Sequence, residues 1–299
     1  MLKIGDITIH LMNDATAYVD PGGFFGLVPR VLYNRYIQPD EHNLIPACHL
    51  SLLVQSADQN ILVDVGFGTK HMKRAARIMN TQVEQMNGVM RGLDALGIQP
   101  SDIDLVIDTH LHNDHCGGNT YYADGNADPV AAFPNAEYVV QRREYEDALQ
   151  PNERTRATYI ADNFEPLVAS GQMRLLDGDT DLAPGVRGVV TSGHTPGHMS
   201  ILFESQGQHA AFVCDMASFA VHIERLGWMT AFDVEPLITL ETKRKWQQWA
   251  VETGATLIFP HDAKRPVGQL KDEEGGKPFL VPIDVPIFGL DVADFNARY

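Results

Sequence analysis

The spacing of apolar residues has two periods along the chain, and these predict strands that alternate with helices. Short apolar or alternating runs predict strands at residues 1–12, 49–54, 61–65, 105–107, 137–141, 173–176, 186–191, 200–204, 210–213 and 257–262. Apolar residues three and four positions apart predict helices at residues 70–96, 142–149, 154–167 and 238–253. Strands followed by helices are typical of an α/β or α+β protein.

Residues that favour turns separate the predicted strands and helices. The polar residues 56–60 predict a turn between two strands, and Gly97 predicts the end of the first long helix. Residues 20–26 form a glycine-rich stretch with adjacent Phe24 and Phe25, which we expect to be a loop that lines a pocket, forms a subunit contact or folds onto its own core. No repeat or long linker interrupts the sequence, so we expect one domain over residues 1–299, with residues 1–45 as an N-terminal extension.

Composition narrows the classes of partner. Hydrophobic residues make up 44% and charged residues 21% of the 299 residues, which is typical of a soluble globular protein. A net charge of -16 repels phosphate groups, so we expect neither a nucleic acid nor a membrane as partner. The N-terminus has no signal-peptide pattern, and this favours a cytoplasmic protein. Cys48, Cys116 and Cys214 have no paired spacing, and we expect small buried residues rather than disulfides or metal ligands.

The candidate chemistry begins directly after the apolar run 105–107. The motif His-x-His-x-Asp-His there contains His110, His112, Asp114 and His115, and two glycines follow it. If the strand continues through the first two histidines, their rings point to the same side. Four nitrogen or oxygen ligands at one strand end are typical of a transition-metal site.

Further ligand-type residues follow other predicted strands: His194, Asp215 and His261. Seven such residues exceed the need of one tetrahedral ion but suit two ions that share a carboxylate. Two divalent metal ions are therefore expected, zinc first, with iron, cobalt or manganese as alternatives. Asp64, between a strand and a glycine turn, either orients a ligand histidine or only forms the turn. For His198 we expect a helper or structural role.

In their order along residues 50–262, these features resemble the metallo-β-lactamase superfamily. The resemblance implies an αββα sandwich with a dinuclear metal site at one edge of the two sheets. It implies that His110, His112 and His194 hold the first ion, that Asp114, His115 and His261 hold the second, and that Asp215 bridges both.

Two segments resemble one branch of that superfamily, the N-acyl-homoserine lactonases and methyl-parathion-hydrolase-like enzymes: the N-terminal aromatic residues, and residues 215–236. The resemblance implies a hydrolase that opens lactone or ester bonds by attack of a hydroxide held between two metals, with an acyl-homoserine lactone as first choice and phosphotriesters as further substrates. Many lactonases carry a tyrosine three residues after the bridging aspartate, where this chain has Ser218. An organophosphate or aryl ester hydrolase, a glyoxalase II-like thioesterase and a mononuclear iron persulfide dioxygenase therefore stay open.

Roles follow for the remaining site residues. We expect Asp114 to transfer the proton of the attacking water and Asp64 to orient a ligand. Six residues are candidates for an apolar wall around a small ester or lactone, although aromatic residues commonly belong to a core: Phe24, Phe25, Phe219, His222, Trp228 and Phe232. The apolar N-terminal extension favours a homodimer.

Overall fold

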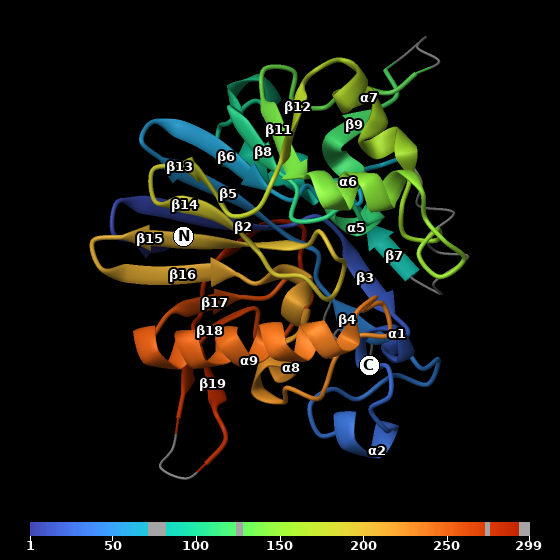
Figure 1. Cartoon of the computed structure of the whole chain (residues 1–299), viewed down its shortest axis with the longest axis vertical. Coiled ribbons are helices and arrows are strands. Elements are labelled where there is room, and N and C mark those ends of the chain that lie inside the picture. Colours follow the sequence, from blue (N-terminus) through green and yellow to red (C-terminus); the bar gives the residue numbers. More distant parts are fainter. Residues whose placement is uncertain (71–81, 124–127, 273–275, 293–299) are drawn as a thin grey trace.

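Two β-sheets lie face to face in a computed structural model that describes residues 1–70, 82–123, 128–272 and 276–292 (Figure 1). The first sheet has eight strands, in the order β1-β2-β5-β6-β8-β11-β12, with β20 beside β2. Its strands are β1 (Leu2–Ile4), β2 (Ile7–Asn13), β5 (Leu50–Ser56), β6 (Gln59–Val63), β8 (Leu105–Ile107), β11 (Glu137–Gln141), β12 (Met173–Leu176) and β20 (Ile287–Gly289).

The second sheet has seven strands in sequence order, from β13 to β19. They are β13 (Thr180–Ala183), β14 (Val186–Val190), β15 (Met199–Ser205), β16 (Gln208–Phe212), β17 (Thr256–Ile258), β18 (Val267–Lys271) and β19 (Phe279–Pro282). Two small sheets complete the strands: β4 (Ile45–Ala47), β3 (Thr16–Val19) and β7 (Gln82–Gln85) in one, and β9 (Thr120–Tyr121) with β10 (Val130–Ala131) in the other.

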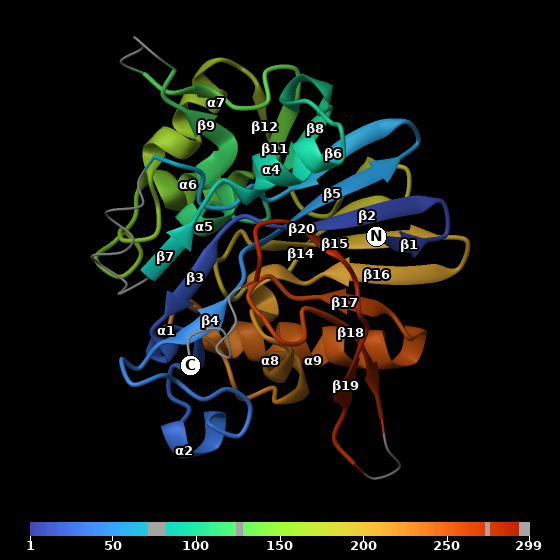
Figure 2. The same ribbon diagram turned by 180° about the vertical axis from the view of Figure 1, so that it is seen from behind.

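The described helices are α1 (Pro21–Phe25), α2 (Arg30–Tyr33), α4 (Gly88–Ala95), α5 (Asn113–Cys116), α6 (Arg142–Leu149), α7 (Glu165–Ala169), α8 (Ala220–Glu224) and α9 (Pro236–Thr253). Of these, α4, α6 and α7 cover the outer face of the first large sheet, and α8 and α9 cover that of the second. Figure 1 shows α9 across the second sheet, and Figure 2 shows α4 on the outer face of the first. Among the described residues, none of these helices is both long and apolar enough to cross a membrane.

Three apolar clusters hold the four layers together. The cluster between the sheets joins residues such as Leu52 and Ile61 of the first sheet to Ile201 and Phe212 of the second. Another packs the first sheet against α4, α6 and α7, and a third packs the second sheet against α8 and α9. Each fully buried leucine or isoleucine contributes about 1.5–3 kcal/mol to folding. The layers confirm the expected αββα sandwich, and the pairing of β20 with β2 is consistent with the single domain, which stays a prediction.

The topology brings the candidate site together. β6, β8, β11 and β12 run parallel, so their carboxyl ends meet at one edge of the first sheet. β16 and β17 are parallel in the second sheet. Residues that follow these strands therefore collect at shared edges, which is why ligand-type residues far apart in sequence can meet.

Three predictions of secondary structure were wrong in part. Residues 82–85 form β7, which pairs with β3, and Asn87 has a left-handed backbone (φ 68°), so residues 82–87 interrupt the helix expected over 70–96 and α4 starts at Gly88; residues 71–81 lie outside the described part. Tertiary strand pairing overrides the helical spacing of apolar residues there. Residues 154–158 form turns because the Asn152 side chain accepts backbone N–H groups of Arg154 and Thr155, and a 3-10 helix at Ala161–Asn163 precedes α7. The loop expected at 20–26 contains α1, which Asp20 caps through Gly22 N.

Candidate metal centre

The His-x-His-x-Asp-His motif forms a loop and a short helix beyond β8. The strand ends at Ile107, as predicted, so the condition that it continue through the histidines is not met. His110 and His112 nevertheless lie with ring centroids 4.5 Å apart, and α5 then carries Asp114 and His115. The loop, rather than strand alternation, gathers the rings.

The carboxylate of Asp215 lies at the middle of the cluster. Its Oδ2 atom is 3.9 Å from Nε2 of His110, 3.4 Å from Nε2 of His115 and 3.3 Å from Nε2 of His194. Its Oδ1 atom is 3.3 Å from Nε2 of His261. One carboxylate therefore faces histidines of both groups that the sequence suggested.

The ligand-type residues form two groups that share Asp215. One consists of His110, His112, His194 and Asp215, whose ligand atoms lie within 4.8 Å of one another, and another of His115, Asp215 and His261. Asp114 lies beside the second group, with Oδ2 3.6 Å from Nε2 of His115 and 3.7 Å from Nε2 of His261. The structure thus brings all seven predicted ligand residues into one cluster, with Asp215 common to both groups.

Polar groups behind the rings hold four histidines in orientation. Nδ1 of His110 is 3.1 Å from Thr109 Oγ1, and Nδ1 of His261 is 2.9 Å from the carbonyl oxygen of Cys48. Nδ1 of His115 is 2.9 Å from Asp64 Oδ2, and Nδ1 of His194 is 2.9 Å from Asp233 Oδ1. Contacts of this kind orient metal-binding histidines in proteins and leave Nε2 for the metal.

The inward nitrogens fit metal ions. Nε2 of His110, His115 and His261 is buried and has no hydrogen-bond partner among the residues that the structure describes. His194 Nε2 and His112 Nδ1 face each other at 3.1 Å. Burial and the neighbouring histidines hold the pKa values of His110 and His112 well below the usual range, so both rings are neutral and can donate a lone pair. Buried, unpaired imidazole nitrogens around a carboxylate are the donor set of a zinc-type site.

Two non-glycine residues with left-handed backbones flank this cluster. Asp64 has φ 52° and Cys214 has φ 47°, a conformation that costs such residues about 1–3 kcal/mol. Asp64 accepts hydrogen bonds from Thr109 N at 2.8 Å and Thr109 Oγ1 at 2.9 Å, besides its contact with His115. Of the two roles considered for Asp64, these contacts favour orienting a ligand over only forming a turn.

Sequence reasoning missed Glu144 on α6. This carboxylate is fully buried and accepts hydrogen bonds from Leu111 N at 3.0 Å, Tyr159 Oη at 3.0 Å and Thr195 Oγ1 at 2.5 Å. It thereby joins the loop of His110 and His112 to the loop of His194. Asp233, which contacts His194, was likewise missed. Glu144 lies three residues beyond the end of β11, a position that could have marked it, whereas Asp233 lies in a turn between α8 and α9.

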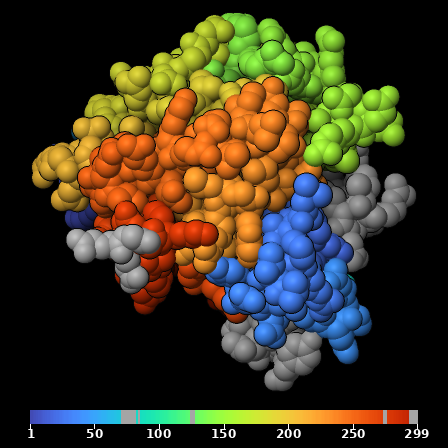
Figure 3. Space-filling model, turned by 60° about the horizontal axis from the view of Figure 1, so that its bottom comes forward, coloured from blue at the N-terminus to red at the C-terminus, as the bar shows by residue number. Residues whose placement is uncertain are grey.

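The aromatic candidates lie beside the second group, largely as packed side chains. The Phe24 ring centroid is 5.2 Å from that of His261 and 5.1 Å from that of Phe219. Phe25 stacks on Tyr33 and contacts His222 and Trp228, and Phe232 contacts Phe24. Figure 3 shows the N-terminal segment, in blue, against the orange surface, and Ala231 N donates to Gly23 O across this contact. Of the six, the structure thus places Phe24 on a metal-site histidine.

The remaining predicted residues have structural contacts. His198 Nδ1 is 2.8 Å from Thr191 Oγ1, and the ring is fully buried. The cysteines are free and buried; Cys214 Sγ is 3.1 Å from Thr109 Oγ1, beneath the cluster. Ser218 Oγ donates to Asp215 Oδ1 at 2.9 Å, so the residue at the lactonase tyrosine position contacts the central carboxylate.

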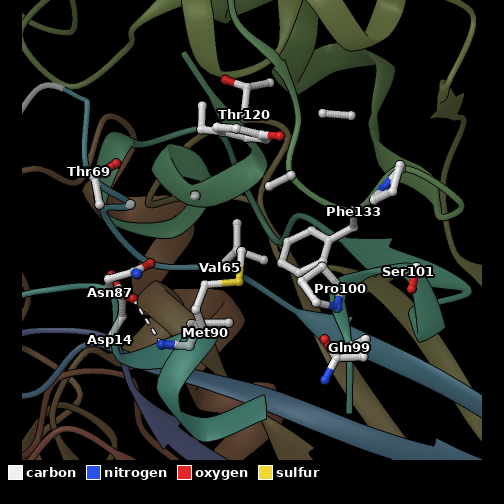
Figure 4. A pocket seen from close by; sticks show the side chains of 17 residues that line it. Asp14, Val65, Thr69, Asn87, Met90, Gln99, Pro100, Ser101, Thr120 and Phe133 are labelled. Carbon is white, nitrogen blue, oxygen red and sulfur yellow. Dashed lines mark hydrogen bonds between the residues drawn. The ribbon is translucent and has the colours of Figure 1, made fainter. Parts of the chain in front are cut away.

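A cavity of about 560 Å³ lies on the other side of the loop that follows the motif, lined partly by Val65, Met90, Gly118 and Phe133 (Figure 4). Asp14 also lines it, and its carboxylate accepts the N–H groups of Phe67 and Val89. None of the seven ligand-type residues belongs to this lining, so the cavity is distinct from the metal centre.

Comparison with known proteins agrees with this geometry. N-acyl homoserine lactonase of a Bacillus species is 27% identical over 225 residues, which cover 72% of this chain and 82% of that protein. The crystal structure of a probable metal-dependent hydrolase from Staphylococcus aureus has a TM-score of 0.83 and 29% identity, over 95% of this chain and 100% of that one. The dizinc quorum-quenching lactonase AidC has a TM-score of 0.76 and 18% identity, over 95% of this chain and 97% of the other.

A family model supports the same assignment. The model of the metallo-beta-lactamase superfamily matches residues 49–249, which contain six of the seven ligand-type residues, with His261 just beyond. The αββα layers are those that the resemblance implied, and the assignment of the ligands to two ions stays a prediction. This chain belongs to the metallo-β-lactamase superfamily.

Proposed function

We propose that this protein is a dinuclear metal-dependent hydrolase that opens lactone or ester bonds, with an acyl-homoserine lactone as the first candidate substrate. The observation that carries the proposal is the position of Asp215 between two groups of inward-facing histidine nitrogens. Support comes from the lactonase relatives at 26–29% identity and from the structural similarity to AidC.

The seven ligand-type residues would hold two divalent ions, and zinc suits their donor set of histidine nitrogen and carboxylate oxygen. His110, His112 and His194 would hold one ion, Asp114, His115 and His261 the other, and Asp215 would touch both. Such a pair supplies an activated water near neutral pH and a Lewis acid for the substrate oxygen.

Asp114 is the residue of the cluster best placed to hold a proton. Its side chain is 26% exposed, whereas those of His115, His261 and Asp215 are at most 7% exposed. The carboxylate therefore borders the side from which water and substrate enter. A carboxylate there can accept the proton of the attacking water and return it to the leaving alkoxide, which is general acid–base catalysis.

The aromatic side of the site would receive the apolar part of the substrate. Phe24 lies on His261 and packs edge to face on Phe219, which makes that side of the cluster apolar. Ser218 donates to Asp215, so it does not replace a lactonase tyrosine as a donor to the substrate carbonyl. This difference keeps aryl esters and phosphotriesters as further substrates of the same site.

A homodimer remains part of the proposal. Leu27 is fully exposed and Val31 is 71% exposed, both on the segment that contains α1 and α2. Exposed apolar side chains this close together are typical of a contact surface. Sedimentation analysis would test the dimer separately from the chemistry.

Elemental analysis of the purified protein, together with hydrolysis assays, tests the proposed function. Two metals per chain and opening of a medium-chain acyl-homoserine lactone are expected, with an aryl phosphotriester and a thioester as comparison substrates. One iron per chain, oxygen uptake with a persulfide and no hydrolysis would overturn the proposal in favour of a dioxygenase.

A further inference from the structure

His49 lies at the metal centre although no motif marks it. It directly precedes β5 and is 3% exposed. Its ring centroid is 4.9 Å from that of His261 and 4.5 Å from that of Phe67. One ligand atom each of His49, Asp114 and His261 lies within 4.8 Å of the others. His49 therefore stands beside two residues of the second metal group.

One nitrogen of the His49 ring could donate a lone pair to a metal ion. Within the described part of the chain, Nδ1 of His49 is buried without a hydrogen-bond partner, as is Nε2 of His261. An unpaired buried polar atom costs about 1–3 kcal/mol, so its retention calls for an explanation such as an ion. Phe67 packs on the ring, with the two ring centroids 4.5 Å apart.

The backbone fixes this position from rigid elements. His49 N donates to Asn13 Oδ1 at 2.9 Å, and Asp14 N donates to His49 O at 2.9 Å, which ties the residue to the end of β2. Cys48, the preceding residue, contacts His261 Nδ1 through its carbonyl oxygen. The same short segment thus orients His261 and presents His49 next to it.

Without His49, the two metal groups differ in their number of histidines. The first group has three histidines besides Asp215, whereas the second has His115 and His261 with Asp114. We propose that His49 is a further ligand of the second metal ion, which gives that ion three imidazole nitrogens. This inference rests on the dinuclear site of the proposed function. A nitrogen-rich second site favours zinc, cobalt or iron over manganese or magnesium.

Metal titration of His49→Ala tests the inference without an activity assay. The apoprotein is titrated with Zn²⁺ against a chromophoric chelator, and with Co²⁺ while its visible absorption is recorded. We expect one ion to bind as in the wild type, the second to bind at least about tenfold more weakly, and the Co²⁺ spectrum of the second ion to change. His10→Ala is the matched control, because it also removes a histidine ring from the first sheet. His10 lies on β2 opposite Leu53 of β5, and its ring packs on Phe288.

The outcomes separate the two proposals. Two ions with wild-type affinities and an unchanged Co²⁺ spectrum in His49→Ala would overturn the role of His49 and leave the dinuclear hydrolase intact. A wild-type protein that binds only one ion would overturn both. If His49→Ala does not fold, His49→Gln keeps the side-chain volume but lacks the imidazole, and the same loss of second-ion affinity is expected of it.

Discussion

Oδ1 of Asp233 lies 2.9 Å from Nδ1 of His194, and both side chains are buried. Thr230 Oγ1 donates to the same carboxylate oxygen at 2.6 Å, which fixes the carboxylate behind the ring. His194 in turn presents Nε2 to Asp215 at 3.3 Å. Asp233 is therefore a positioning residue that sets the orientation of one ligand of the first metal group.

Substitution of Asp233 should weaken metal binding while the fold is retained. In Asp233→Asn the charge that holds His194 is lost, so we expect affinity for the first ion to fall about 10–100-fold. Competition titration with a chelator measures this affinity. Glu235→Gln, two residues along and partly exposed, is the control. Unchanged affinity in Asp233→Asn would show that His194 needs no support.

Glu144 should contribute to stability through the two loops it joins. Glu144→Ala leaves three buried donors, on Leu111, Tyr159 and Thr195, without their acceptor. We expect the free energy of unfolding to fall by about 3–5 kcal/mol, because each unsatisfied buried group costs about 1–3 kcal/mol and water recovers part of this. Urea denaturation measures it, with Glu146→Ala on the exposed face of α6 as control. A loss no larger than the control's would contradict this role.

Whether a residue of the site can be predicted depends on which element precedes it in the sequence. His194, Asp215 and His261 come three or four residues after apolar strands that run in the same direction, so strand order was enough to bring them to one edge. Glu144 and Asp233 lie on a helix and in a turn, and only the tertiary fold makes them neighbours of Leu111 and His194. Side-chain contacts between distant segments leave no periodic trace in a single sequence.

The same limit explains the errors in secondary structure. Val83 continues the three- and four-residue spacing of the following helix, yet it lies in β7 opposite Ala17. Its conformation depends on β3, some 65 residues earlier, and a local pattern cannot represent that pairing. In contrast, α6 has the bounds that its apolar spacing predicted, because that helix ends where Pro151 follows.

Asp14 should make stability depend on pH. Burial raises its pKa to about 6, and the N–H groups of Val89 and Phe67 offset only part of that effect. Because the folded form holds its proton more tightly than the unfolded chain, the stabilisation is full below about pH 3.8 and is lost as pH rises from there through 6, by about 3 kcal/mol. The unfolding free energy of the wild-type apoprotein minus that of the Asp14→Asn apoprotein should fall by most of that amount from pH 4 to 8. A constant difference would exclude the raised pKa.

Metal removal should lower stability because the ligand groups exist only in the folded chain. Bound ions stabilise the folded state by about 4 kcal/mol when the free ion is at 1,000 times its dissociation constant. We expect the melting temperature to fall on chelation and to recover when Zn²⁺ is added back. Asp215→Asn, which alters the carboxylate common to both groups, should lose most of this metal-dependent shift. An equal shift in that variant would argue that the ions bind elsewhere.

Phe24 should affect substrate selectivity more than turnover. Its ring lies on His261 and Phe219, so Phe24→Ala opens the apolar side of the metal centre while the ligands stay in place. We expect KM for a long-chain acyl lactone to rise about tenfold, which corresponds to about 1.4 kcal/mol of lost apolar contact, and kcat to change little. The loss should shrink as the acyl chain shortens.

Phe25→Ala on the same short helix controls for packing, because Phe25 stacks on Tyr33 and contacts Phe219, His222 and Trp228, behind the face that Phe24 turns to His261. That variant should lower stability without making KM depend differently on chain length. If Phe24→Ala raises KM equally for short and long acyl chains, or if Phe25→Ala gives the same chain-length dependence, Phe24 is a core residue and the acyl chain binds on another side of the cluster.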